Sequence, residues 1–193
     1  MAYSVLVVCT GNLCRSPAVQ HLLADALDDS VDVTSAGTHG MPGWPIDDRM
    51  AARLADEGID ATAFRSRPLT ADLMAGADLV IALTAAHRAP ALDLFPAAVR
   101  RTVTLGELAR LAHEVPPGSV VGRKDAERLA ALVPAALAQR HRFLGAGQDD
   151  DVPDPYRRSD DVYRLAYAHL RWHVHRLVAA LRPEEDVRAD QLR

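Results

Sequence analysis

Residues 4–17, which read S-V-L-V-V-C-T-G-N-L-C-R-S-P, decide the fold of this chain. Residues 5–8 are apolar and mostly β-branched, which predicts a short strand buried on both faces. Pro17 is tolerated in the first turn of a helix, and apolar residues recur at helical spacing over residues 18–27. The loop between strand and helix therefore directs backbone N–H groups and a helix N-terminus at one small volume, as anion sites do.

Four side chains and one glycine of this loop suit chemistry on a bound phosphoryl group. The amides, the helix N-terminus and Arg15 all favour the thiolate of Cys9, which is a nucleophile. The planar guanidinium of Arg15 matches two phosphate oxygens, and Ser16 is placed to donate to the sulfur. Asn12 tolerates left-handed backbone and suits pinning the loop, while Gly11 gives freedom in a tight turn. A buried strand-end cysteine beside a surface arginine is the alternative interpretation.

The run from Val8 to Pro17 resembles the phosphate loop of the low-molecular-weight protein tyrosine phosphatases. The resemblance implies that Cys9 is the nucleophile, that Arg15 clamps the phosphate and that Ser16 stabilises the thiolate. It also implies that Ser35, after the second strand, helps to order the loop. The remaining loop positions expected to contact substrate are Thr10, Gly11, Asn12, Leu13 and Cys14.

Members of this family carry a general acid in a distant Asp-Pro sequence, and Asp154-Pro155 supplies one here. The resemblance implies that Asp154 protonates the leaving group in the first displacement and activates water in the second. It further implies that Trp44, in a loop rich in glycine and proline, and Tyr156 form two walls of a slot for a phosphorylated phenol. A polar turn between helices is the alternative interpretation of residues 149–155.

Alternating strand and helix patterns predict a single α/β domain with a four-stranded parallel sheet and helices on both faces. The active site should lie beyond the carboxyl ends of the strands, where Cys9 is placed. The predicted strands are residues 4–8, 31–35, 78–83 and 101–105, and the predicted helices are residues 18–27, 47–57 and 160–181. Residues 1–182 are expected to form the phosphatase domain, with a family-atypical insert over about 112–151 that includes a helix over residues 124–144. Residues 183–193 are expected to form a charged tail.

Composition narrows the function classes. A net charge of −4 and a pI near 6.0 argue against a nucleic-acid partner bound through bulk charge. There is no signal peptide pattern and no apolar run of the ~18 residues that span a membrane, so we expect a cytoplasmic protein without a membrane partner. Nothing in the sequence indicates an oligomeric state.

Both cysteines lie in the loop, which excludes a disulfide framework. No histidine cluster accompanies them, so no metal and no cofactor is expected. The histidines outside the last helix are scattered and form no evident constellation: His21, His39, His87, His113 and His141. Cys14 is either a small packing residue or, as the resemblance suggests, a thiol that traps oxidised Cys9 as a reversible disulfide.

The chain departs from the family pattern at two places. Phe64 stands where a histidine commonly supports the loop, and Thr84 stands where the family often has the aspartate of Ala-Met-Asp. The leading expectation is a phosphatase whose partner is a phosphotyrosine-bearing protein. Protein-arginine phosphatases carry threonine at the position of Leu13, which makes phosphoarginine a less favoured alternative. Arsenate reduction usually needs further cysteines, and none follows Cys14; a non-catalytic phosphate-binding module is the last alternative.

Overall fold

A parallel sheet of four strands organises the molecule, and the computed structural model describes residues 2–116, 118–143 and 151–182. The strands are β1 (Tyr3–Cys9), β2 (Val31–Gly37), β3 (Leu79–Ala82) and β4 (Thr102–Thr104). They lie in the order β2-β1-β3-β4, and every neighbouring pair is parallel. This confirms the predicted α/β architecture, and each predicted strand overlaps an observed one.

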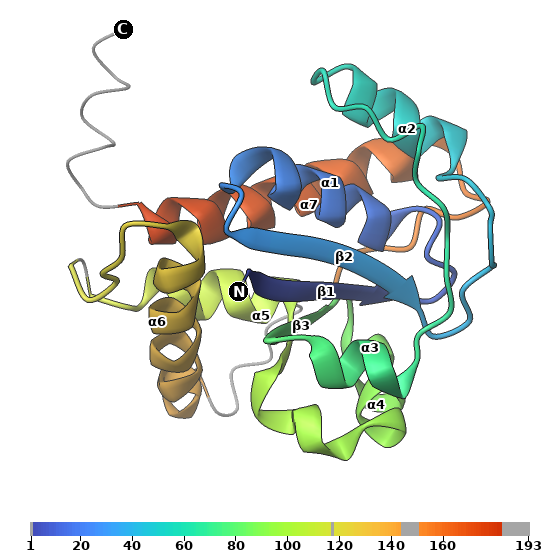
Figure 1. Cartoon of the computed structure of the whole chain (residues 1–193). Coiled ribbons are helices and arrows are strands. Elements are labelled where there is room, and N and C mark those ends of the chain that lie inside the picture. Colours follow the sequence, from blue (N-terminus) through green and yellow to red (C-terminus); the bar gives the residue numbers. More distant parts are fainter. Residues whose placement is uncertain (1, 117, 144–150, 183–193) are drawn as a thin grey trace, which may run out of the picture.

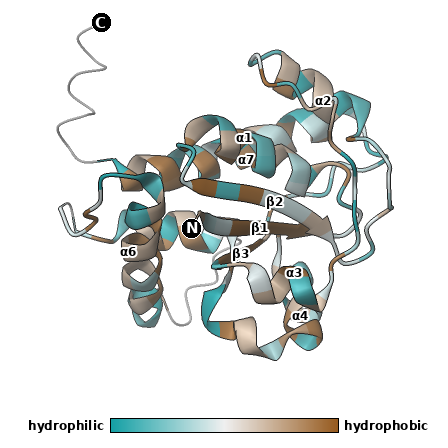
Figure 2. Ribbon diagram, viewed as in Figure 1, coloured by the Kyte–Doolittle hydropathy of each residue, from teal (hydrophilic) through white to brown (hydrophobic). Residues whose placement is uncertain are grey.

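Helices cover both faces of this sheet (Figure 1). They are α1 (Arg15–Ala26), α2 (Asp48–Ala55), α3 (Ala71–Gly76), α4 (Ala85–Leu94), α5 (Leu105–His113), α6 (Asp125–Ala138) and α7 (Asp160–Leu181), with 3-10 helices η1 (Pro96–Arg101) and η2 (Gln139–Phe143). Successive residues of a strand point to opposite faces, so β1 contributes to two hydrophobic clusters. Val5, Val7 and Cys9 pack with residues of α1, α2, α5, α6 and α7, whereas Leu6 and Val8 pack with residues of α3, α4 and η1. Figure 2 shows β1 and β3 as hydrophobic along most of their length, as burial on both faces requires.

The long helix predicted over residues 160–181 is confirmed as α7, and α1 begins at Arg15 rather than at Ala18. Pro17 falls in the first turn of α1, where its missing N–H has no intrahelical partner to lose. None of the helices in the described ranges is both long and apolar enough to cross a bilayer.

The sequence pattern did not predict α3, α4 and α5, which are short and, in α4, contain a proline. A common signal marks their starts. Thr70, Thr84 and Thr104 are the N-cap residues, and each side chain accepts a hydrogen bond from the backbone N–H three residues later. Threonine is a favoured N-cap because it satisfies one of the free N–H groups of the first turn. These three threonines were the available evidence for the helices.

The predicted insert contributes α6 and η2, and α6 buries Leu129, Leu132 and Val133 as expected. Residues 117 and 144–150 of the insert, and the predicted tail at 183–193, lie outside the described residues. Helix α6 therefore packs on the body of the domain, against α5 and α7.

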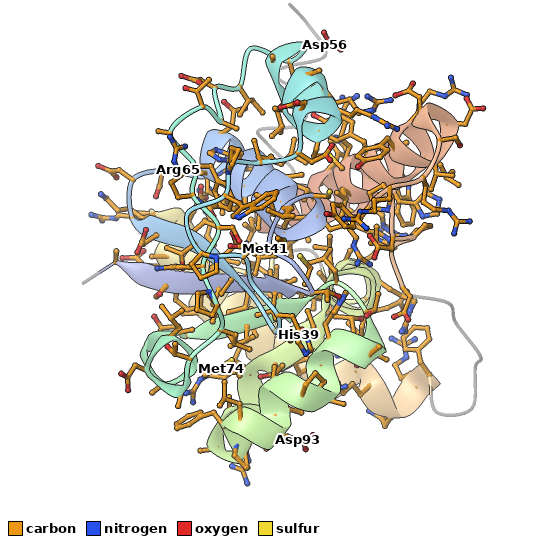
Figure 3. The ribbon with its side chains drawn as sticks, turned by 90° about the vertical axis from the view of Figure 1, so that its right-hand side faces the viewer. His39, Met41, Asp56, Arg65, Met74 and Asp93 are labelled. Carbon is orange, nitrogen blue, oxygen red and sulfur yellow. The ribbon has the colours of Figure 1, made fainter. Side chains whose placement is uncertain are left out.

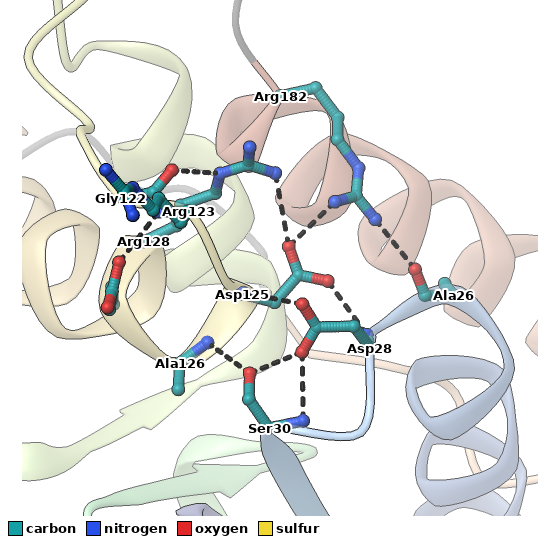
Figure 4. A network of polar contacts seen from close by, with 10 residues as sticks. Ala26, Asp28, Ser30, Gly122, Arg123, Asp125, Ala126, Arg128 and Arg182 are labelled. Atoms are coloured by element: carbon teal, nitrogen blue, oxygen red, sulfur yellow. Dashed lines mark hydrogen bonds and ion pairs between the residues drawn. The ribbon is translucent and has the colours of Figure 1, made fainter.

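A polar network joins the start of α6 to the turn between α1 and β2 (Figure 4). The side chain of Lys124, the N-cap residue, makes no capping bond, and Asp28 and Ser30 accept from the first N–H groups of α6 instead. Asp125 is buried, accepts from the backbone N of Asp28 at 2.9 Å and pairs with Arg182 at 2.7 Å. The cap is thus supplied by a segment nearly one hundred residues away in the chain.

We expect Asp125→Ala to destabilise the fold by about 2–4 kcal/mol, because it removes a buried carboxylate and leaves the amide and guanidinium groups bound to it without that partner. The measurement is the free energy of unfolding in urea. Asp29→Ala is the matched control, since Asp29 forms only an exposed ion pair with Lys124 at the same turn. The control should cost less than about 1 kcal/mol. Equal stability of the two variants would show that the network does not hold α6 in place.

Candidate active site

The loop between β1 and α1 turns its carbonyl groups outward. The oxygens of Cys9, Thr10 and Leu13 accept hydrogen bonds of 2.9 Å from the backbone N–H groups of the segment after β2. The oxygen of Gly11 accepts from the Ser66 hydroxyl at 3.0 Å. Because each peptide unit directs its N–H opposite to its C=O, the amides of this loop face the enclosed volume, as in other anion-binding nests. Asn12 takes the left-handed backbone expected for it, with φ of 53°.

The Cys9 thiol lies buried at the base of this loop, 3.0 Å from the Ser16 hydroxyl oxygen. Asn12 Nδ2 donates to Ser16 Oγ at 2.9 Å and to Ser35 Oγ at 2.8 Å. Since Ser16 Oγ accepts from Asn12, its own proton is available to the sulfur. The structure therefore brings together Cys9, Ser16, Asn12 and Ser35, as the sequence predicted.

The loop network is complete without the histidine that Phe64 replaces. The Phe64 ring is buried and lies edge-on to His21, with ring centroids 6.1 Å apart. The network ends instead at Gln20, whose side-chain oxygen accepts from Ser35 Oγ at 2.7 Å. The backbone N–H of Arg67 donates to Asn12 Oδ1 at 2.9 Å. Both ends of the Asn12 amide are thus held, so the departure at Phe64 leaves no bond of Asn12 unmade.

Arg15 connects the two distant motifs. One terminal nitrogen of its buried guanidinium lies 2.9 Å from Asp154 Oδ2, and the other donates to the carbonyl of Val152 at 3.2 Å. The backbone N–H of Val152 donates to the carbonyl of Leu83 at the end of β3. The Asp154 side chain is 55% exposed, so water screens this ion pair. The predicted acid therefore lies beside the phosphate loop, within reach of a group bound above Cys9.

A cavity of about 230 Å³ opens above the thiol. Its lining residues are Cys9, Thr10, Gly11, Leu13, Cys14, Arg15, His39, Met41, Asp154 and Tyr156. Most were predicted from the sequence, but His39 and Met41 were not. Figure 3 shows both on the loop that follows β2. Asn12, Ser16 and Ser35 are buried behind the lining and act on it through hydrogen bonds.

The structure does not bring Trp44 into this cavity, and the expectation that it walls the slot is corrected. Its side chain is 54% exposed, and Met41 lies on the cavity wall in its place. Gly37 explains the close approach of this segment, since a Cβ there would collide with the carbonyl oxygen of Thr10. Gly40 packs as tightly on the backbone of Arg67. Gly37 at the end of β2 and Gly40 after it were the signal that the nearest residues of that loop, rather than Trp44, reach the site.

The expectation that His87 belongs to no constellation is also wrong. His87 is buried in the first turn of α4 and bonds with Thr84 through one ring nitrogen and with Thr10 through the other. Burial, and secondly the charge of Arg15, lower the pKa of His87 to about 4, so the ring is neutral near pH 7. The pattern Thr-x-x-His at a helix start was the signal, and it falls at the family departure Thr84.

Cys14 lines the cavity and is held by a separate pair of residues. Its sulfur lies 3.9 Å from the Tyr163 hydroxyl, which donates to Asp47 Oδ2 at 2.9 Å. Burial, followed by the charge of Asp47, raises the pKa of Cys14 to about 12. Cys14 is therefore a thiol near neutral pH and does not compete with Cys9 as a nucleophile.

Comparison with known proteins agrees with this geometry. The family model described as low molecular weight phosphotyrosine protein phosphatase matches residues 4–116. The low molecular weight protein-tyrosine-phosphatase Etp of Escherichia coli is 30% identical over 167 residues, which is 86% of each chain. The crystal structure of the tyrosine phosphatase AmsI of Erwinia amylovora superposes with a TM-score of 0.69 at 23% identity, over 93% of each chain, and shows the shared fold.

A solved structure of a phosphatase named for a different substrate is also similar. The YwlE arginine phosphatase of Geobacillus stearothermophilus has a TM-score of 0.66 and 27% identity, and the alignment covers 98% of this chain and 96% of that one. The match of the family model to more than half of the chain, together with the identity to Etp over most of both proteins, settles the family. This chain belongs to the low molecular weight phosphotyrosine protein phosphatase family.

Proposed function

We propose that this protein removes phosphate from tyrosine residues of other proteins through a phosphocysteine formed at Cys9. The observation that carries the proposal is the single cavity in which the Cys9 thiol, the Arg15 guanidinium and the Asp154 carboxyl meet. The loop amides supply the charge stabilisation that a phosphoryl group needs in transit. No residue of this set is missing or replaced.

In the first step, the Cys9 thiolate attacks phosphorus and the bond to the phenolic oxygen breaks. Asp154, protonated, donates its proton to that oxygen, so that a neutral phenol leaves. Before substrate binds, Asp154 is paired with Arg15. We infer that the incoming phosphoryl group takes over the guanidinium, whose fork matches two of its oxygens. This exchange frees the carboxyl group to face the leaving oxygen.

In the second step, the Asp154 carboxylate takes a proton from water and the resulting hydroxide attacks phosphorus. The P–S bond breaks, inorganic phosphate leaves and the thiolate of Cys9 is restored. The hydrogen bond from Ser16 stabilises the sulfur as it departs. The proposed steps use one carboxyl group first as acid and then as base, which requires it to reach both the leaving oxygen and the water.

The walls of the cavity favour an aryl substrate. Leu13, Met41 and Tyr156 present mostly apolar surface around the thiol, which suits a phenyl ring better than a charged guanidinium. Phosphoarginine is the second candidate, and the likeness to the Geobacillus arginine phosphatase favours it. Arsenate reduction has less support, since the sequence has no cysteine after Cys14 to relay a disulfide.

The deciding experiment is phosphate release from matched phosphotyrosine and phosphoarginine peptides. We expect the wild type to have the higher kcat/KM on phosphotyrosine. Leu13→Thr should shift the ratio of the two kcat/KM values toward phosphoarginine by about tenfold, since a hydroxyl replaces apolar surface at the cavity wall. Leu13→Val is the matched control, because valine has the shape of threonine without the hydroxyl. A wild type that prefers phosphoarginine would overturn the proposed substrate.

We also propose that Cys14 protects Cys9 from irreversible oxidation. Cys9 and Cys14 line the same cavity, so both sulfurs belong to one site. A sulfenic acid on Cys9 would condense with the Cys14 thiol, releasing water and leaving a reducible disulfide. Such an enzyme would suit the cytoplasm, where thiol reductants restore both cysteines, and we propose that location.

We expect wild-type activity lost to hydrogen peroxide to return on addition of dithiothreitol. In Cys14→Ser, most of the lost activity should stay lost, because sulfenic acid proceeds to sulfinic acid when no second thiol traps it. Activity is measured for each protein relative to its own untreated sample. Equal recovery in both proteins would assign Cys14 a packing role only.

A further inference from the structure

A buried chain of three side chains leads from α4 to the phosphate loop. Thr84 Oγ1 lies 2.9 Å from His87 Nδ1, and His87 Nε2 lies 2.9 Å from Thr10 Oγ1. His87 is 6% exposed and Thr84 is 8% exposed, whereas Thr10 lines the open cavity. The chain therefore begins inside the protein and ends at the residue next to Cys9.

The hydrogen bonds of Thr84 set the direction of this chain. Thr84 Oγ1 accepts the backbone N–H of His87 at 3.2 Å as the cap of α4. A hydroxyl that accepts one bond is best satisfied by donating its own proton, here to His87 Nδ1. A neutral imidazole has one donor nitrogen and one acceptor nitrogen, so the proton of the ring is then on Nε2. Nε2–H donates to Thr10 Oγ1 and leaves the Thr10 proton free.

We propose that His87 is a positioning residue, which holds the Thr10 hydroxyl as a donor aimed at the phosphoryl group bound above Cys9. The Thr10 backbone carbonyl accepts a bond from the loop after β2, which fixes the peptide while His87 fixes the side chain. This proposal rests on the proposed function, since it takes the ligand of the same cavity to be a phosphoryl group. His87 touches no reacting atom and acts only through Thr10.

The groups around His87 keep its ring neutral, and a neutral ring preserves the direction of these hydrogen bonds. Its ring is neutral near pH 7, because burial and then the charge of Arg15 lower its pKa, while Asp154 acts in the opposite sense. An imidazolium would donate from both nitrogens and would force Thr84 to stop donating. A neutral ring is therefore needed for a chain that runs in one direction from the helix cap to the cavity.

The first test reads the tautomer directly. Nitrogen-15 chemical shifts of the His87 imidazole are recorded in the phosphate-free protein at pH 7, with a His87 variant to assign the signals. We expect a protonated Nε2 and an unprotonated Nδ1, and we expect the Nε2 signal to move in Thr10→Val and when inorganic phosphate is added. A ring protonated on Nδ1 would overturn the proposal, because the Thr10 hydroxyl would then donate its hydrogen bond to His87.

The second test uses two substitutions, each of which retains the hydrogen-bonding position of one imidazole nitrogen. In His87→Gln the amide nitrogen reaches the position of Nε2 and retains the donor to Thr10. In His87→Asn the amide reaches only the position of Nδ1 and retains the contact with Thr84. We expect His87→Asn and Thr10→Val each to weaken binding of inorganic phosphate by about tenfold, the loss of one charge-assisted hydrogen bond. His87→Gln should restore most of that affinity.

The double variant Thr10→Val/His87→Asn should bind phosphate no more weakly than either single variant, because both remove the same bond. Equal losses in His87→Gln and His87→Asn, or additive losses in the double variant, would show a structural role only. Thermal unfolding of each variant verifies the fold. Phosphate titration does not depend on turnover, so a protein that binds phosphate in this pattern but leaves phosphotyrosine intact would contradict the proposed function alone.

Discussion

Cys9→Ser should lower kcat for phosphotyrosine peptide by on the order of 10⁴-fold or more, while the loop still binds inorganic phosphate. The hydroxyl of serine stays protonated where the thiolate of cysteine is stabilised, so the nucleophile is lost. The amides of the loop and Arg15 remain, because they are held by bonds to the segment after β2 and by the acid loop. Steady-state kinetics and equilibrium phosphate titration measure the two quantities separately.

The comparison of kcat and phosphate affinity makes this test specific. A misfolded variant would lose both turnover and phosphate affinity, whereas removal of the nucleophile should lower only kcat. The Cys9 side chain is buried against the core, and the change from sulfur to oxygen is small, so the fold should survive. Phosphate release by Cys9→Ser at a rate near that of the wild type would remove Cys9 from the role of nucleophile.

The sequence predicted best those parts of the site whose residues are close together in the chain. The loop from Cys9 to Ser16 is a contiguous run, and the structure places the Cys9 thiol beside the Ser16 hydroxyl as that run predicts. Asn12, which was expected to contact substrate, is instead buried behind the cavity lining and holds the loop through hydrogen bonds. The ion pair of Arg15 with Asp154 was not predicted, although the resemblance implied that both residues serve one site; it forms because the acid loop is anchored next to the end of β3, beside β1.

Two errors and one unpredicted contact have a different origin, because each depends on residues that lie far apart in the chain. Met41 rather than Trp44 reaches the cavity, since the backbone beyond Gly37 runs close along the phosphate loop. His87 was taken as isolated because its two partners, Thr84 and Thr10, are 3 and 77 residues away. The cap of α6 comes from the distant α1–β2 turn. Sequence periodicity reports burial and says little about which distant polar groups meet.

The departures from the family pattern are best understood as substitutions within networks. Phe64 stands where the resemblance led us to expect a histidine, and Gln20 is the acceptor at the end of the loop network. Thr84 stands where it led us to expect an aspartate, and its hydroxyl caps α4 and contacts His87. In the first case the acceptor is a side chain of α1, and in the second it is the hydroxyl of the residue at the same position. Buried loops of this kind persist only when every polar group is satisfied.

Asp154→Ala should have the second largest effect, and its size should depend on the leaving group. With phenyl phosphate, whose leaving group is a strong base, we expect kcat to fall by about 10²–10⁴-fold, since no acid protonates the departing oxygen. With an activated aryl phosphate such as 4-nitrophenyl phosphate, the fall should be much smaller at the step that forms the phosphocysteine. Burst kinetics separate that step from hydrolysis of the intermediate.

The same variant gives a second result that a damaged active site would not. Asp154 pairs with one arm of the Arg15 guanidinium, so its removal should strengthen binding of inorganic phosphate, which no longer displaces a carboxylate. Asp160→Ala is the matched control, because it removes an exposed carboxylate a short distance along the chain that pairs with Arg53 instead. Equal losses of rate on both substrates, with phosphate affinity unchanged, would remove Asp154 from the acid role and leave its pairing with Arg15 a structural contact.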